Sequence, residues 1–260
     1  HRADAIITLI DPFVLAPSVY APLNWVAWTP IDSEPILPEN VAALQSAKRI
    51  WAMSKFGERQ LLAAGFTNVN YVPHGVDSRV FRRLNKTHAL NRLKHDCGID
   101  LAGKFVVTMN SANKGTPSRK GFFEAFASFK AFSDEHPDAM LYIHSERDGI
   151  WHGEHLPTLA QMLGLASDRL IYAPQYHYVN GMLPPSFLTD IYNVSDVFLH
   201  TSHGGGFEIP LVESQLCGTP VIVTDFSAMS ELVFAGWKVP GVPFMHATGA
   251  TQRLPIIGEV

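Results

Sequence analysis

The chain has 260 residues, of which 47% are hydrophobic and 17% charged, so it can bury a sizeable core as one large domain or two smaller ones. Its formal charge of −4 and pI near 6.3 give no basic surplus, which argues against a nucleic-acid partner. Cys97 and Cys217 are too few for a disulfide framework or a thiolate metal site, and no apolar run reaches the length of a membrane span, so we expect a globular protein in the reduced cytoplasm.

Short β-branched and aromatic runs alternate with helical patterns in the first third of the chain. We expect strands at residues 5–9, 25–29, 49–53 and 69–72, and helices at residues 38–47 and 55–64. Ser54 is the expected N-cap of the second helix, and Gly65 closes it. This alternation predicts an α/β fold with a parallel sheet. In the turn P-H-G-V-D that follows, His74 and Asp77 favour a structural role.

The remainder predicts a second α/β unit. A linker with a short helix at residues 87–97 leads to its first strand at residues 105–109, after which a long loop ends in Arg119, Lys120 and Gly121. The other expected elements are helices at 122–133, 156–163 and 183–193, and strands at 140–144, 169–172, 197–201 and 221–223. We therefore divide the chain into a first domain at residues 1–84, a linker at 85–103 and a second domain at 104–260.

A glycine loop, residues 204–206, lies between the strand at 197–201 and a helix that Pro210 begins and Gly218 ends. Glycines let backbone N–H groups approach a ligand closely, and a helix N-terminus carries about half a positive charge. This arrangement at the carboxyl edge of a parallel sheet is suited to holding a phosphate. His200 and His203 flank the loop and are interpreted as solvent-facing; the alternative is that either one hydrogen-bonds oxygens of the bound ligand.

The full string is more specific than this geometry. It reads Y-N-V-S-D-V-F-L-H-T-S, then G-F-x-I-P-L-V-E-S-Q-x-C-G-T-P-V-I-V-T-D, and resembles the signature of retaining glycosyltransferases of family 4. The resemblance implies a GT-B fold, in which residues 1–84 are the later part of an acceptor-side Rossmann-like domain and residues 104–260 form the donor-binding domain. It implies a nucleotide-diphosphate sugar as donor, a hydroxyl as acceptor and retention at the anomeric carbon.

Members of that family normally possess a further N-terminal stretch, so we expect this chain to be a fragment. A peripheral membrane contact is open for that further part, and no oligomeric state is predicted. Two alternatives remain within the fold: a nucleotide-sugar epimerase or phosphorylase, and a non-catalytic nucleotide-sugar-binding module.

The diphosphate of such a donor needs cations or dipoles that stabilise it as it departs. No two aspartates are spaced as Asp-x-Asp, so we expect no metal and no other cofactor. The resemblance places Lys120, directly before Gly121, on the phosphates, with Arg119 or Lys114 as the accompanying cation. The alternative interpretation of Arg119 and Lys120 is a solvated surface patch.

Glu213 is the expected acid of the site, because its two oxygens suit the two hydroxyls of a ribose. By resemblance it is the second acid of a Glu-x7-Glu motif whose first acid contacts the donor sugar, and the first position is Gly205. Three alternatives follow: Glu208 reaches the same space from three residues along, the contact is lost, or the donor sugar needs none. We expect backbone N–H groups of Gly206, Phe207 and Glu208 to face the donor, and the loop at residues 173–175, including Gln175, to receive its base.

Overall fold

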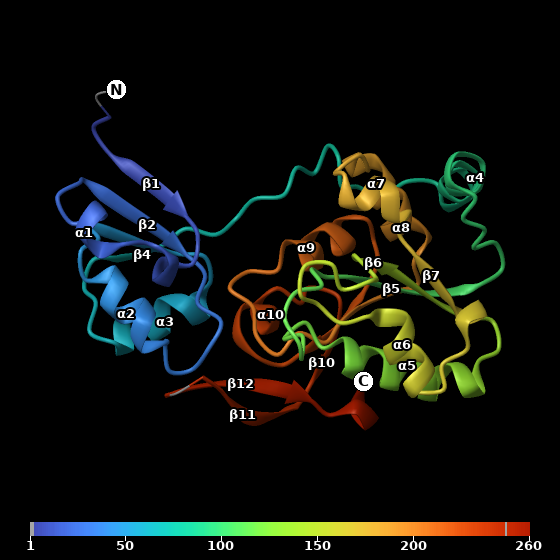
Figure 1. Ribbon diagram of the computed structural model, residues 1–260. Coiled ribbons are helices and arrows are strands. Elements are labelled where there is room, and N and C mark those ends of the chain that lie inside the picture. The colour runs from blue at the N-terminus through green and yellow to red at the C-terminus, as the bar shows by residue number, and fades with distance from the viewer. Residues whose placement is uncertain (1–2, 248) are drawn as a thin grey trace.

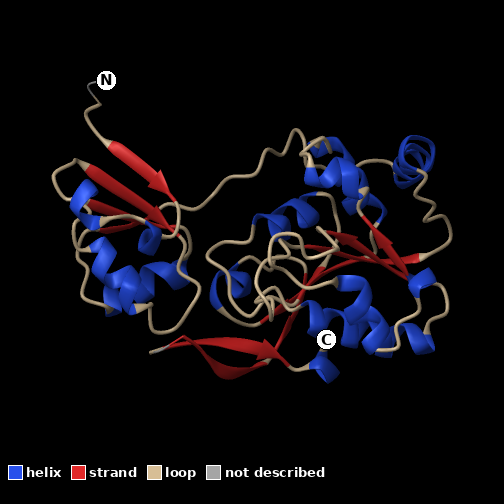
Figure 2. Ribbon diagram, viewed as in Figure 1, coloured by secondary structure: helices blue, strands red, loops and turns tan. Residues whose placement is uncertain are grey.

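The computed structural model describes residues 3–247 and 249–260, which form two lobes joined by an extended segment (Figure 1). Each lobe contains a parallel sheet flanked by helices (Figure 2). The first lobe has four parallel strands in sequential order: β1 (Ile6–Leu9), β2 (Trp25–Thr29), β3 (Arg49–Ala52) and β4 (Val69–Tyr71). Its helices are α1 (Pro17–Tyr20), α2 (Pro38–Leu44) and α3 (Lys55–Ala63).

The second lobe has a six-stranded parallel sheet in the order β10-β9-β8-β5-β6-β7. Its strands are β5 (Phe105–Asn110), β6 (Ala139–His144), β7 (Leu170–Tyr172), β8 (Val197–His200), β9 (Val221–Thr224) and β10 (Gly236–Val239). This is the order of doubly wound nucleotide-binding sheets, and strand order reverses between β5 and β8. Ligands of such sheets bind beyond the carboxyl ends of the strands at that reversal.

The helices of the second lobe are amphipathic and cover both faces of this sheet. Phe122, Phe126 and Phe129 lie on one side of the helix predicted at residues 122–133, and all three are buried against one face of the sheet. Ala89, Leu93 and Ile191 bury the opposite face. The helices are α4 (Lys86–Cys97), α5 (Phe122–Glu135), α6 (Leu156–Met162), α7 (Gln175–Val179), α8 (Pro185–Val194), α9 (Ile209–Leu216) and α10 (Ser227–Glu231).

Most predicted elements are confirmed to within a few residues, but the last part of the chain adds unpredicted structure. An antiparallel hairpin, β11 (Gly241–Ala247) and β12 (Ala250–Pro255), extends toward the first lobe in Figure 1. Thr251 of this hairpin forms an isolated β-bridge with Glu34 of the first lobe. The hairpin therefore joins the two lobes on the side opposite the linker. No helix within residues 3–247 and 249–260 is long and apolar enough to span a bilayer.

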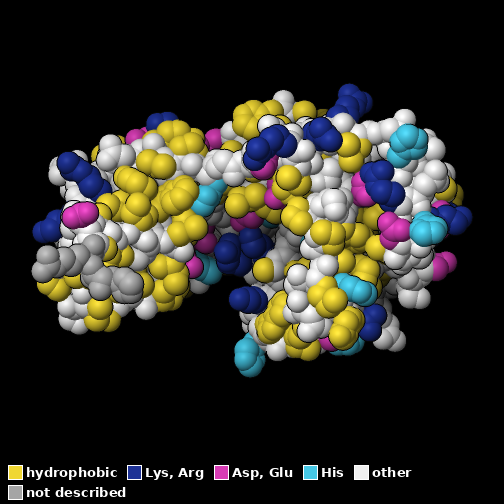
Figure 3. All heavy atoms as spheres, turned by 90° about the horizontal axis from the view of Figure 1, so that it is seen from above, with side chains coloured by type: hydrophobic (Ala, Val, Ile, Leu, Met, Phe, Trp, Pro, Cys, Tyr) yellow, Lys and Arg dark blue, Asp and Glu magenta, His cyan; other side chains and the backbone are white. Residues whose placement is uncertain are grey.

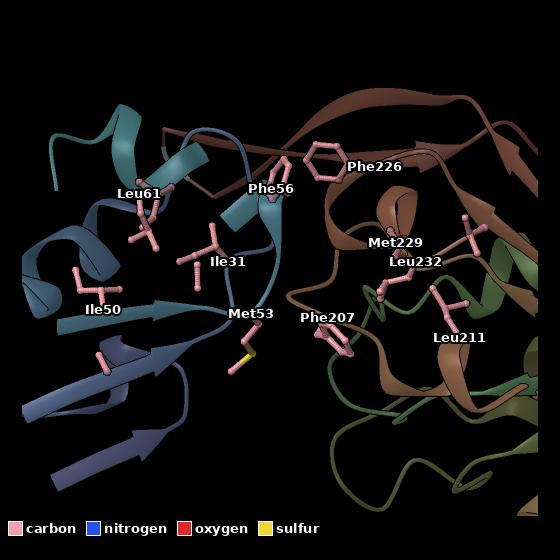
Figure 4. Packing of buried hydrophobic residues seen from close by; sticks show 14 of the residues in the cluster. Ile31, Ile50, Met53, Phe56, Leu61, Phe207, Leu211, Phe226, Met229 and Leu232 are labelled. Atoms are coloured by element: carbon pink, nitrogen blue, oxygen red, sulfur yellow. The ribbon is translucent and has the colours of Figure 1, made fainter. Parts of the chain in front are cut away.

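The two lobes share an apolar contact, in which Phe56 and Met53 of the first lobe face Phe226 and Phe207 of the second (Figure 4). The rings of Phe56 and Phe226 meet edge to face with centroids 5.2 Å apart. A polar contact adjoins them: the carboxylate of Glu231 accepts the N–H groups of Lys55 and Phe56 at 2.8 and 2.5 Å. Ser54 accepts the N–H of Gly57 as the predicted N-cap, so both lobes contribute to capping α3.

Gly206 lies directly against Pro30 of the first lobe. A β-carbon there would lie 2.2 Å from Cβ and 2.7 Å from Cα of Pro30, and the backbone of Pro30 cannot move aside freely. We expect Gly206→Ala to lower the free energy of unfolding by about 1–3 kcal/mol, as overpacking does. The matched control is Gly75→Ala, because nothing lies within 4 Å of a β-carbon at that position. Urea denaturation of both variants checks this, and equal midpoints would contradict the close approach.

Candidate functional site

The candidate site lies where the loops after β5 and β8 meet, at the reversal of strand order. Gly121 makes the contact possible, because a β-carbon there would lie 2.2 Å from the carbonyl oxygen of Thr201. The hydroxyl of Thr201 donates to the carbonyl of Gly121 at 2.7 Å, and the N–H of His203 donates to the carbonyl of Arg119 at 2.9 Å. These bonds fix Lys120 beside the glycine loop. Figure 3 shows Lys or Arg side chains beside acidic side chains in the notch between the lobes.

Lys120 and Glu208 form a buried ion pair at this point. Nζ of Lys120 lies 2.6 Å from Oε1 of Glu208, and the two side chains are only 14% and 9% exposed. Burial by itself would raise the pKa of Glu208, but the Lys120 ammonium and the His200 ring hold that pKa well below its usual range. The interpretation of Lys120 as a solvated surface patch is therefore wrong, since its ammonium is buried.

His200 is the third member of this cluster and lies beside the Glu208 carboxylate. Its ring is fully buried at the end of β8, where it stacks on Phe198 with centroids 6.0 Å apart. Nε2 lies 3.1 Å from Oε2 of Glu208, out of good hydrogen-bond alignment, and Nδ1 has no partner among the described residues. His203 is also buried, with Nε2 3.0 Å from Oε1 of Glu124. The interpretation of His200 and His203 as solvent-facing is therefore wrong, because both side chains are buried.

Arg119 points toward the first lobe. Its Nη1 donates to the carbonyl of Gly204 at 2.7 Å and lies 3.5 Å from the carboxylate of Asp32. Arg119 thus fixes the glycine loop while its side chain remains 42% exposed, and its guanidinium has further donors for an anion. Lys114, the alternative cation, is exposed in the loop before Arg119.

Glu213 lies in the second turn of α9 and faces two polar side chains. The hydroxyl of Tyr192 donates to Oε2 of Glu213 at 3.0 Å, and the amide of Asn110 donates to the Tyr192 hydroxyl at 2.9 Å. Burial raises the pKa of Glu213, and the Tyr192 hydrogen bond opposes that rise. Oε1 remains available to a ligand hydroxyl, since the Tyr192 bond uses the other oxygen.

The side chains of Phe207 and Gln175 are committed to the fold. Phe207 is buried and its ring meets that of His74 edge to face at 5.2 Å. Gln175 begins α7, where its amide donates to the carbonyls of Ser145 and Ala173 at 3.0 and 2.8 Å, and its Oε1 accepts the N–H of Arg147 at 3.1 Å. At both positions a ligand would therefore meet main-chain groups rather than the side chain.

Two cavities lie away from this cluster. The larger, of about 500 Å³, lies between α4 and α8 beside the Arg92–Asp190 ion pair, and the other, of about 400 Å³, lies near Arg83 and Asp196. Neither is lined by Arg119, Lys120, Glu208 or Glu213. We place the site at the polar cluster, because its charges lie beyond the carboxyl ends of β5 and β8, where the strand order reverses and ligands of such sheets bind. Across the described parts of the chain, no three His, Cys, Asp or Glu side chains gather as a metal site would require.

Comparison with known proteins identifies the relatives of this chain. The model of the family "Glycosyl transferases group 1" matches residues 111–251. A D-inositol 3-phosphate glycosyltransferase of Acidothermus cellulolyticus is 28% identical over 195 residues, which cover 72% of this chain and 40% of the relative. One of Gordonia bronchialis is 33% identical over 94 residues, covering 36% and 19%. The chain thus spans well under half the length of these curated relatives.

Two solved structures show the same fold. The Anabaena protein HepE in complex with UDP-glucose aligns with a TM-score of 0.67 at 19% identity, covering 90% of this chain and 65% of that one. Sucrose-phosphate synthase from Thermosynechococcus elongatus aligns with a TM-score of 0.64 at 17% identity, covering 84% and 55%. The predicted GT-B architecture is therefore confirmed. Since the family model spans residues 111–251, more than half of the chain, the protein belongs to the group 1 family of glycosyl transferases.

Proposed function

We propose that this protein transfers a sugar from a nucleotide-diphosphate sugar to an acceptor hydroxyl, with retention at the anomeric carbon and without a metal. The observation that carries the proposal is the buried Lys120 ammonium beside the glycine loop, at the reversal of strand order. Burying a lysine is costly unless a negative charge accompanies it, and Glu208 supplies that charge in the free protein. A ligand that brings a diphosphate to this place meets a cation that is already desolvated and positioned.

The leaving diphosphate is stabilised by the cations of the loop after β5. Lys120 contributes a point charge, and Arg119 contributes N–H donors from a guanidinium that the Gly204 carbonyl orients. Backbone N–H groups of Gly206, Phe207 and Glu208 add dipoles at the start of α9. In this scheme the negative charge that develops on the departing nucleotide meets fixed positive groups, so no metal ion is needed.

The nucleoside end of the donor is held by Glu213 and by the main chain. Oε1 of Glu213 accepts a hydrogen bond from a ribose hydroxyl, while Tyr192 keeps the carboxylate oriented through Oε2. The base lies against the main chain at residues 173–175, because the Gln175 side chain is occupied by the fold. The acceptor would enter from the first lobe, whose Asp32 lies near Arg119.

The relatives support this proposal. Curated relatives are named glycosyltransferases, and HepE was solved with UDP-glucose. We therefore take UDP-glucose as the first probe, with GDP-mannose and ADP-glucose beside it. We expect calorimetry of the full-length protein to detect binding of at least one of the three. Failure to bind any of them would contradict a transferase and also a nucleotide-sugar-binding module.

The role of Glu213 is tested with the nucleotide alone, using the diphosphate that the panel selects and its 2′-deoxy form. We expect the protein to prefer the ribonucleotide by about tenfold, and Glu213→Gln to abolish the preference, because a hydrogen bond to a charged group contributes about 1.5–3 kcal/mol. Glu135→Gln, an exposed acid at the end of α5, is the matched control and should leave the preference unchanged. An unchanged preference in Glu213→Gln would remove Glu213 from the ribose site.

A further inference from the structure

Gly205 and Glu208 compete for one space. A β-carbon on Gly205 would lie 2.3 Å from Oε1, 2.5 Å from Cγ and 2.7 Å from Cδ of Glu208. The carboxylate of Glu208 therefore fills the volume that a side chain at residue 205 would occupy. Only one of the two positions can carry a side chain in this place, and in this sequence it is the later one.

The backbone conformation at residue 208 is unusual for a glutamate. Glu208 has φ +72° and ψ +70°, a left-handed conformation that glycine adopts freely and other residues rarely. Gly205 does not share the left-handed φ recorded for many other glycines of the described chain, so its backbone does not demand glycine. The conformational preference of each position thus favours the residue found at the other. Strain of this kind persists where the surroundings fix the side chain.

Two groups contact the Glu208 carboxylate in this space. Lys120 contacts Oε1 at 2.6 Å, and His200 lies 3.1 Å from Oε2. Burying an imidazole costs free energy when a ring nitrogen has no hydrogen-bond partner, and Nδ1 of the buried His200 has none among the described residues. The polar group that this ring faces is the Glu208 carboxylate. Each carboxylate oxygen is contacted by one group and retains a further acceptor position.

We propose that Glu208 accepts hydroxyl groups of the donor sugar from the space beside Gly205, and that His200 is the positioning residue that holds it there. The inference rests on the proposed function, since it needs a diphosphate at Lys120. A group that contacts the same ammonium as the diphosphate lies next to the sugar bonded to that diphosphate. Ionised carboxylates accept hydrogen bonds from vicinal hydroxyls, and this gives Glu208 its chemistry.

The decisive experiment exchanges the two residues. Calorimetry compares UDP-glucose with UDP, or the pair of sugar nucleotide and nucleotide that the panel selects, on four full-length proteins. We expect Glu208→Gly to lose about 10- to 100-fold in affinity for the sugar nucleotide and far less for the nucleotide. Gly205→Glu alone forces two side chains into one space and should lose as much. The double variant Gly205→Glu/Glu208→Gly should recover most of the sugar-nucleotide affinity, because the carboxylate returns to the same volume.

His200 is tested by conservative rescue. We expect His200→Leu to reduce the sugar-nucleotide affinity by about tenfold while nucleotide affinity holds, and His200→Gln, which keeps an N–H donor near the Nε2 position, to recover it. A residue needed only for folding would lower both affinities together, and the glutamine would not separate them.

The outcomes separate this inference from the proposed function. If neither nucleotide nor sugar nucleotide binds the wild-type protein, the proposed function fails and the inference with it. If both bind but Glu208→Gly affects them equally, or the double variant is no better than Glu208→Gly, the proposed function stands and the inference is overturned. Equal loss of both affinities in His200→Leu and His200→Gln would remove His200 as a positioning residue.

Discussion

Replacing Lys120 with alanine is expected to weaken nucleoside diphosphate binding by about 100-fold or more. The substitution removes the ammonium that faces the diphosphate and also leaves the Glu208 carboxylate without its partner. The local charge therefore changes from balanced to negative, and an attraction becomes a repulsion in a poorly solvated place. Titration calorimetry with UDP, GDP and ADP measures the change.

Two further variants sharpen this result. Lys104→Ala, an exposed lysine that precedes β5 at the opposite end of the strand, is the matched control and should leave affinity unchanged. Lys120→Ala/Glu208→Ala should bind better than Lys120→Ala, since removing the carboxylate removes the repulsion. Equal affinities for Lys120→Ala and Lys104→Ala would exclude Lys120 from the diphosphate site.

Replacing Glu208 with glutamine is expected to lower the free energy of unfolding by about 3 kcal/mol, the lower end of the range for breaking a buried pair. The substitution keeps the shape of the side chain but leaves the 14%-exposed Lys120 ammonium unbalanced. The double variant Lys120→Met/Glu208→Gln should recover part of the loss, because no buried charge then remains. Urea denaturation of the two single variants and the double gives the coupling energy, and additive effects would contradict a buried pair.

The stability of the fold should depend on pH through the same Lys120–Glu208 pair. The folded state holds the pKa of Glu208 well below its usual range, so the unfolded chain binds the proton first as the pH falls. The stability that this carboxylate contributes is fully present above the ordinary glutamate pKa of about 4.3 and is lost as the pH falls through the depressed value. Between pH 5 and 3 the wild-type protein should therefore lose more stability than Glu208→Gln, and parallel losses would contradict the depressed pKa.

The regular elements of this fold were predictable because their signals are local. Ser54 precedes a helical pattern and caps α3, and Gly218 follows α9 in a left-handed conformation. The hairpin β11–β12 was not predicted, because its strands are stabilised by each other and by Glu34, far away in sequence. Helix α7 was not predicted either, because its five residues are too few for a helical pattern of apolar positions to show.

The motif placed Lys120 before a helix and Glu213 in the helix after the glycine loop, and both residues have those positions in the structure. Their roles in ligand binding stay predictions. The sequence could not show that the Glu208 side chain fills the space beside Gly205, because this depends on the positive φ of Glu208 and on the direction of its side chain. His200 was misread as solvent-facing, since no local pattern shows that Glu208 returns over the end of β8. Its place inside an otherwise apolar strand run was the available signal.

A crystal structure of the protein with the sugar nucleotide it binds would test the central claim most directly. We predict the diphosphate within hydrogen-bond distance of Lys120 Nζ and of the backbone N–H groups at residues 206–208, with a ribose hydroxyl on Glu213 and a sugar hydroxyl on Glu208. A ligand seated instead in the cavity between α4 and α8, with the Lys120–Glu208 contact untouched, would contradict the account.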